Sequence, residues 1–419
     1  MSFDSIVLTV YDSAGTVYGV TWQTKKEGKP FLEYTSEDDI LFEHSIKTAA
    51  KMSPSLKAIK NSAEIRGLRP GEKCRYRVGD EDSGVSEDAV FTAFSQDPDK
   101  SDFIVVSDTQ RGDRNFTSFA YVRDDILSRF PKSEFWINAG DTVETTRYPE
   151  QWNKFFADNA AIVRTKPLLP VTGNHDYCWG YTHDYKQIFF NHVNIGLPPQ
   201  DTRYGIYYSV DNGPVHIAVL NTGDWEVSGD AHIHGVRGGL LDSQIEWLKK
   251  DLIETDKEWK IVVLHNPLYS PGKYGVDFEE NFMAIALRGQ LDRILSEYRV
   301  DLVINGHDHV YSETYPMTAD GQPITDTKYE NAEIEGIQGT VVVDPKGPIH
   351  FQPLESGGNV GHSLIDINPP FRIIYDRNSD NNIAAYVHVT AEHGRLDLTT
   401  RILKKNEITK QFAFGITKH

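Results

Sequence analysis

Residues 301–309 of the chain, DLVINGHDH, decide the fold. The apolar half of this stretch predicts a buried strand, and its polar half begins where that strand ends. Side chains alternate in an extended chain, so His307 and His309 leave the backbone on the same side. Imidazole binds Zn, Fe and Mn well. The pair alone is weak support for a metal site, because a lone histidine after a strand is more often an ordinary loop residue.

Other segments repeat this order of an apolar run followed by side chains that can bind a metal. They are residues 103–107 before Asp108-Thr109-Gln110, 135–138 before Gly140-Asp141, 168–172 before Gly173-Asn174-His175-Asp176, and 261–264 before His265. In open α/β sheets, ligands bind at the carboxyl ends of the strands. The ordered recurrence of these segments therefore predicts that their strand ends converge on one active site.

The side chains at these strand ends are carboxylates, amides and imidazoles, and no thiolate is among them. This mixture suits a pair of divalent or trivalent cations, with Fe, Mn or Zn as candidates. Two metals about 3.5 to 4 Å apart can polarise a phosphoryl oxygen and hold a hydroxide that attacks phosphorus. The chemistry expected is therefore hydrolysis of a phosphoester by a dinuclear metal centre.

The order D-x-(H/Q), G-D, G-N-H-D, a lone His and then G-H-x-H resembles the calcineurin-like metallophosphoesterase superfamily across roughly residues 100 to 320. Residues 265–269 and 306–311, together with Gly357-Gly358-Asn359, are most similar to the purple acid phosphatase branch. The resemblance implies an α/β fold built as a four-layer αββα sandwich. It also implies a small all-β sandwich domain ahead of the catalytic domain.

The resemblance assigns the candidate ligands to two metal sites that share one bridging residue. Asp141 would be the bridge, which suits a carboxylate that directly follows its strand. The first metal would be held by Asp108 and His309 with Gln110 as a candidate third ligand, and the second by Asn174, His265 and His307. His175 would stand just outside the metals as the phosphate-binding acid, because its ordinary pKa lies near neutrality.

Two positions depart from the family pattern. Most members carry His where Gln110 stands, and an amide donates less charge, so the first metal should be bound more weakly or use another ligand. Glu144 stands where purple acid phosphatases carry the Tyr that gives them their colour. The protein should therefore not be purple, and Glu144 either supplies an oxygen ligand or points to solvent. Asp176 or Asp308 would orient the imidazoles of the site as outer partners.

The chain has 419 residues, which exceeds the usual size of a single core, so two domains are expected. Residues 1–98 contain short alternating runs between turn-rich stretches, and they predict a β-sandwich that resembles a fibronectin type III domain. Residues 99–419 form the catalytic domain in this prediction. Helical spacing there covers residues 116–130, 244–253 and 282–298, in alternation with apolar strands.

The formal net charge is −18, which argues against a nucleic-acid polymer as partner and leaves a small phosphoester that the metals attract. No apolar segment is long enough to span a bilayer, and the first residues lack the pattern of a signal peptide. Cys74 and Cys178 lie in different predicted domains, so no disulfide is expected. These features favour a cytoplasmic protein, although a chain trimmed to a secreted mature form would look the same. The sequence does not indicate an oligomeric state.

Two other functions compete with phosphoester hydrolysis. The chain could be a non-catalytic metal-containing binding module, in which the β-sandwich recognises a partner and the metal site has decayed at Gln110. Retention of His175 argues against decay, since that residue serves turnover rather than metal binding. The same ligands could also hydrolyse a non-phosphate ester. Substrate-binding residues are not assigned, and His232 and His234 belong either to a substrate lid or to an ordinary loop.

Overall fold

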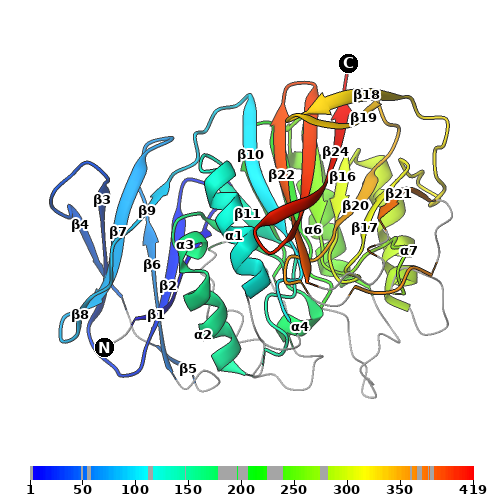
Figure 1. Cartoon of the computed structure of the whole chain (residues 1–419). Coiled ribbons are helices and arrows are strands. Elements are labelled where there is room, and N and C mark those ends of the chain that lie inside the picture. The colour runs from blue at the N-terminus through cyan, green and yellow to red at the C-terminus, as the bar shows by residue number, and fades with distance from the viewer. Residues whose placement is uncertain are drawn as a thin grey trace.

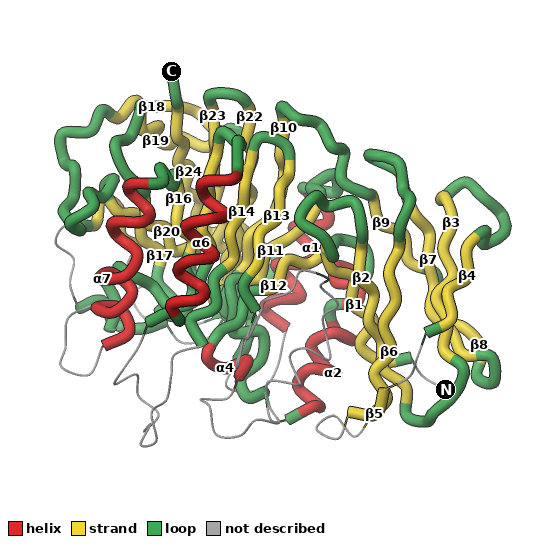
Figure 2. Tube along the Cα trace, turned by 180° about the vertical axis from the view of Figure 1, so that it is seen from behind, coloured by secondary structure: helices red, strands yellow, loops and turns green. Residues whose placement is uncertain are grey.

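The computed structural model describes residues 3–48, 51–53, 58–111, 117–146, 148–177, 196, 206–223, 239–273, 282–358, 361–365, 370–375, 377 and 382–419. Within these residues the strands form a 12-stranded, a 7-stranded and a 5-stranded sheet. Helices α1 to α3 lie on one side of the two larger sheets, and α6 and α7 lie on the opposite side (Figure 1, Figure 2). The layers run helix, sheet, sheet, helix, so the predicted four-layer fold is confirmed.

The N-terminal part of the chain is all β, as predicted (Figure 1, blue). Its smaller sheet consists of β3 (Pro30–Ser36), β4 (His44–Lys47), β7 (Lys73–Asp80), β8 (Gly84–Val85) and β9 (Ala89–Thr92). The facing strands are β1 (Asp4–Val10), β2 (Tyr18–Thr24), β5 (Lys51–Ser53) and β6 (Ala58–Ile65). Every second side chain of β6 is buried, which is the alternation expected when one face of a strand packs on a core.

The 12-stranded sheet joins these N-terminal strands to the catalytic part of the chain. The strands that it adds are β10 (Lys100–Val106), β11 (Phe135–Asn138), β12 (Leu168–Pro170), β18 (Tyr329–Ile334), β19 (Ile337–Val343), β22 (Ile383–Glu392), β23 (Arg395–Lys404) and β24 (Glu407–Thr417). The connection is made by β1, which pairs in parallel with β12 and places Thr9 opposite Leu168. Backbone hydrogen bonding therefore continues from the predicted N-terminal sandwich into the catalytic part.

The 7-stranded sheet faces the catalytic half of the larger sheet. It consists of β13 (Tyr208–Asn212), β14 (Val215–Val219), β15 (Trp259–Val263), β16 (Leu302–Ile304), β17 (Tyr311–Thr314), β20 (Ile349–Pro353) and β21 (Phe371–Tyr375). The pairs β14–β15, β15–β16 and β16–β20 are all parallel. The carboxyl ends of these strands consequently open on one edge of the sheet.

The described helices are α1 (Thr117–Arg129), α2 (Pro149–Asp158), α3 (Ala160–Val163), α4 (Asn174–Tyr177), α6 (Asp242–Glu254) and α7 (Phe282–Glu297). Three of them, α1, α6 and α7, begin and end close to where the spacing of apolar residues predicts them, and α2, α3 and α4 were not predicted. Helix α6 buries Gln244, Leu248 and Leu252, which lie four residues apart and therefore share one face. None of the described helices combines the length and the apolarity that crossing a membrane requires.

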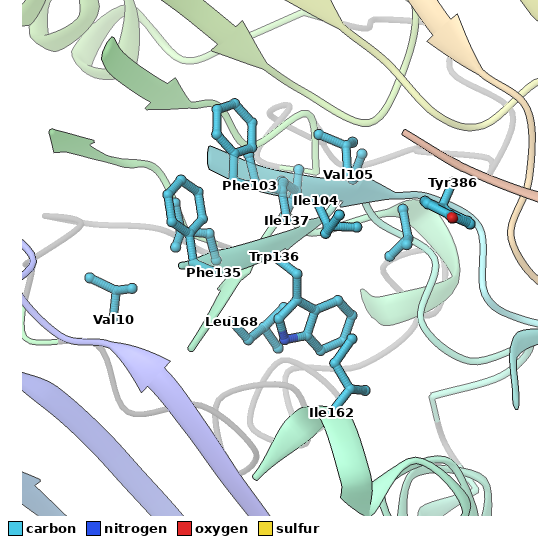
Figure 3. Packing of buried hydrophobic residues seen from close by; sticks show 14 of the residues in the cluster. Val10, Phe103, Ile104, Val105, Phe135, Trp136, Ile137, Ile162, Leu168 and Tyr386 are labelled. Carbon is cyan, nitrogen blue, oxygen red and sulfur yellow. The ribbon is translucent and has the colours of Figure 1, made fainter. Parts of the chain in front are cut away.

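Strands β10 and β11 are covered on both faces (Figure 3). Phe103 and Phe135 stack on one face, with ring centroids 4.8 Å apart. Trp136 points to the other face near Ile162 of α3, and its indole nitrogen donates a hydrogen bond to the carbonyl of Lys166. Strands buried in this way consist of continuous apolar residues. The polar residues that follow them are consequently conspicuous in the sequence.

Candidate metal centre

The loops at the strand ends of both large sheets meet at one edge of the molecule, beside α4 (Figure 1). Within the first sheet, the backbone nitrogen of Asp108 donates to the carbonyl of Gly140 at 3.0 Å. Across the two sheets, the backbone nitrogen of His307 donates to both carboxylate oxygens of Asp108 at 3.0 Å. The structure therefore brings together all the predicted ligands, although they come from distant parts of the chain.

One group of ligand atoms surrounds His265. Ligand atoms of Asp141, His265 and His307 lie within 4.8 Å of one another. The Nε2 atom of His265 is 3.1 Å from Asp141 Oδ2 and 3.1 Å from Asn174 Oδ1. Its Nδ1 atom donates to the carbonyl of Ala139 at 2.8 Å, so Nε2 is the ring nitrogen that can accept a metal. This group contains every residue predicted for the second metal.

A second group surrounds His309. The Nε2 atom of His309 is 3.4 Å from Asp108 Oδ1 and 3.4 Å from the amide of Gln110. The amide of Gln110 also lies 3.3 Å from Asp141 Oδ2. Asp141 therefore touches both groups, which is the position predicted for a bridging ligand.

The orientation of the Gln110 amide bears on its role as a ligand. Turning the amide over lets its nitrogen donate to the backbone carbonyls of Asp108 at 3.3 Å and Asp141 at 2.8 Å. The same turn directs the amide oxygen toward His309 and the Asp141 carboxylate, because it takes the place of the nitrogen. The amide nitrogen then has two acceptors, and the amide oxygen faces the candidate ligands.

The donor set fits metal ions. Asp108 and Asp141 are each 1% exposed, and in the part of the chain that the structure describes neither is paired with a lysine or an arginine. Buried carboxylates are costly unless a cation compensates them. Burial raises the pKa of Asp141, but the charges of His265 and His175 outweigh it and hold that pKa below its ordinary value. An anionic oxygen surrounded by imidazole nitrogens suits divalent or trivalent cations.

Several candidate ligands have an unusual backbone. Asp108, Asp141, His307 and His309 have φ angles of 51°, 55°, 75° and 51°, in the left-handed region that residues other than glycine seldom adopt. Gly140 precedes one of them with a φ of 98°, and a Cβ atom there would lie 2.4 Å from His265 Nδ1. Such conformations cost energy, and they concentrate at functional sites.

His175 lies beside these groups rather than within them. Its Nδ1 atom donates to the carbonyl of Glu144 at 2.7 Å, and its Nε2 atom is 3.9 Å from Asp141 Oδ2. Burial lowers the pKa of His175, but the negative charge of Asp141 and the Glu144 carbonyl outweigh it, so the pKa is raised. The carboxylate of Glu144 contributes to the same rise, and its Oε2 atom is buried. Glu144 thus lies on the His175 side and does not simply point to solvent.

The two acids expected as outer partners have different contacts. Asp176 accepts hydrogen bonds from the backbone nitrogens of Asp141 and Thr142, both at 2.9 Å, so it fixes the loop that carries the bridge. Burial and the charge of Asp141 raise the pKa of Asp176 to about 7. Asp308 instead accepts a hydrogen bond from His362, a histidine that the strand-end pattern did not identify because it follows no apolar run.

Some other predictions concern residues outside the ranges that the structure describes. These residues are Cys178, His232, His234 and Asn359, together with the rest of 112–116, 178–195, 197–205 and 224–238. Cys74 is a free, buried cysteine.

Comparison with known proteins identifies the family. Residues 101–311 match the calcineurin-like phosphoesterase family, and residues 3–93 match the purple acid phosphatase N-terminal domain. The chain belongs to the calcineurin-like phosphoesterase family. The resemblance found in the sequence is thereby confirmed for both parts of the chain.

Individual relatives are distant. Acid phosphatase type 7 of Danio rerio is 24% identical over 79% of this chain and 73% of its own length. Probable inactive purple acid phosphatase 1 of Arabidopsis thaliana is 25% identical over 50% of this chain and 33% of its own length. The chain spans about a third of the length of three of the curated relatives that it matches. The structure of purple acid phosphatase PPD1 from yellow lupin has a TM-score of 0.75 and 18% identity over 99% of this chain and 75% of its own, and it supports the fold alone.

Proposed function

We propose that this chain is a dinuclear metal-dependent phosphoric ester hydrolase, acting as a phosphatase or phosphodiesterase. The observation that carries the proposal is the position of Asp141, whose carboxylate touches both groups of candidate ligands. A shared anion between two such groups suits two metal ions held close together. Membership of the phosphoesterase family supports the same reaction class.

The contacts among the candidate ligands divide them into one set for each metal. Asp108, Gln110 and His309 would hold the first metal, and Asn174, His265 and His307 the second, with Asp141 between them. Bound metals would supply Lewis acidity toward the phosphoryl group and the attacking water. Fe, Mn and Zn all suit this donor set, and the neutral amide of Gln110 predicts a weaker first site.

The chain itself would supply the acid. Because the pKa of His175 is raised from its ordinary value, its ring holds a proton to a higher pH than an ordinary imidazole does. The carbonyl of Glu144 fixes Nδ1, which leaves Nε2 on the side of Asp141, where a phosphoryl group would bind. From there, Nε2 can donate to a phosphoryl oxygen or give its proton to the leaving alkoxide.

The substrate that fits is a small phosphoester. A net charge of −18 disfavours binding of a polyanion such as nucleic acid, whereas bound metals would attract a single phosphoryl group locally. Danio rerio acid phosphatase type 7, which aligns over most of the chain, is named for phosphate ester hydrolysis and supports this class.

The test combines metal analysis with a pair of substrates. Protein reconstituted separately with Mn, Fe or Zn would be analysed by elemental mass spectrometry and assayed with p-nitrophenyl phosphate and bis-p-nitrophenyl phosphate. We expect about two metals per chain and hydrolysis of at least one ester. Two bound metals without hydrolysis of either ester would instead favour a non-catalytic binding module.

A further inference from the structure

We propose that His362 contacts the phosphoryl group of the substrate, as a second imidazole on the His309 side of the metal centre. The proposal rests on the proposed function, since it requires a phosphoryl group at the ligands described above. His175 occupies the other side, next to Asp141.

The backbone holds the segment that carries His362 against the loop following the ligand His265. Gly272 and Leu364 form an isolated antiparallel bridge, and the nitrogen of Ile365 donates to the carbonyl of Pro271 at 2.8 Å. A Cβ atom on Gly272 would lie 2.4 Å from Asp308 Oδ2, so this loop packs directly against the acid between the two ligand histidines. The position of His362 is therefore set by the metal loops themselves.

The ring of His362 is oriented by Asp308. Its Nδ1 atom donates to Asp308 Oδ1 at 2.8 Å, while Ser270 Oγ donates to Asp308 Oδ2 at 2.6 Å. Asp308 is fully buried, and it lies between His307 and His309 in the chain. A buried carboxylate that accepts a hydrogen bond from Nδ1 fixes the tautomer and the orientation of an imidazole. With Nδ1 engaged, Nε2 is the ring atom through which His362 would contact a ligand.

The ring also lies against a candidate metal ligand and reaches solvent. The rings of His362 and His309 stack in parallel, with centroids 4.8 Å apart and planes inclined by 9°. The side chain of His362 is 25% exposed, compared with 6% for that of His309. His362 is thus the more exposed of the two stacked rings, and it lies directly against the candidate ligand.

The contacts of His362 resemble those of His175 in one respect. In each case an oxygen atom accepts a hydrogen bond from Nδ1. This oxygen belongs to the Glu144 carbonyl for His175 and to the Asp308 carboxylate for His362. Two imidazoles held in this way can each hydrogen bond to a different non-bridging oxygen of one phosphoryl group. A phosphate monoester offers three such oxygens and a diester only two, so His362 should matter more for monoesters.

The test uses His362→Ala, with His393→Ala as a matched control. His393 is 91% exposed and pairs with Glu258 at the turn between β22 and β23. Metal content would be measured first, and inorganic phosphate would then be titrated calorimetrically into the metal-loaded proteins. We expect His362→Ala to retain both metals and to bind phosphate about 10- to 100-fold more weakly, as for a lost hydrogen bond to a charged group. His393→Ala should match the unmodified protein.

A second variant and a kinetic measurement separate substrate contact from structural support. His362→Gln retains a side-chain donor and should recover part of the phosphate affinity. For p-nitrophenyl phosphate, His362→Ala should raise KM more than it lowers kcat. Unchanged phosphate affinity, or loss of metal that explains the whole defect, would overturn the proposal. Phosphate binding weakened by His362→Ala in a protein that hydrolyses no ester would support His362 and refute the hydrolase function.

Discussion

Replacing His175 by Ala should slow hydrolysis while leaving the metals in place. The Nε2 atom of His175 lies 3.9 Å from the Asp141 carboxylate, and we expect a phosphoryl group held by the metals that Asp141 would bridge to lie at a similar distance. Two unit charges about 4 Å apart interact by about 4 kcal/mol at an effective dielectric constant of about 20. That energy corresponds to about 10³-fold in rate. It falls within the range of about 10² to 10⁴ expected for a lost acid or electrostatic group.

The assay measures kcat with p-nitrophenyl phosphate and metal content on the same preparations. His175 contacts Asp141 through its backbone nitrogen at 2.8 Å, and that contact survives truncation of the side chain. Metal content should therefore not change, and His393→Ala again serves as the histidine control. The assignment of His175 would be refuted by full activity of His175→Ala, or by loss of metal comparable with that of Asp141→Asn.

Three further predictions follow from other side chains. Asp141→Asn removes the charge shared by both groups, so it should abolish metal retention together with hydrolysis; elemental analysis showing two metals would contradict this. Because Glu144 replaces a phenolate, the iron-loaded protein should lack a visible charge-transfer band, and a purple preparation would refute this. Burial lowers the pKa of His216, but Asp211 and Asp251 raise it to about 9 from its ordinary 6.5. The resulting stabilisation, about 3 kcal/mol, should be complete below pH 6.5 and lost as pH rises through 9, and denaturant unfolding of His216→Gln should show no such loss.

Much of the fold could be predicted from the sequence because its strands are covered on both faces. The bounds of β11, Phe135–Asn138, are those of the predicted apolar run. Strands β10 and β15 and helices α6 and α7 differ from the predicted ranges by a few residues at their ends. A buried apolar run that ends at a polar residue marks both the strand and the direction of its carboxyl end. The candidate ligands could be identified for the same reason.

Other features depend on contacts that no local pattern encodes. The pairing of β1 with β12 joins Thr9 to Leu168, and neither residue differs from those of an ordinary sandwich strand. His362 follows no apolar run, and tertiary contacts such as the bridge between Gly272 and Leu364 place it at the metal centre. The role of Asp176 likewise arises from the fold, because its partners are backbone nitrogens, which every residue but proline offers.

The pairing of β10 with β22 has a consequence for synthesis of the chain on the ribosome. Residues Phe103 and Ile104 lie opposite Val389 and His388, so one edge of β10 stays without its partner until β22, far along the chain, has been made. An open edge of an apolar strand is a template for pairing with other chains. The N-terminal strands can pair among themselves much earlier, because β2 and β6 are close in sequence. The nascent protein should therefore depend on chaperone protection for the catalytic part far longer than for the first β-strands.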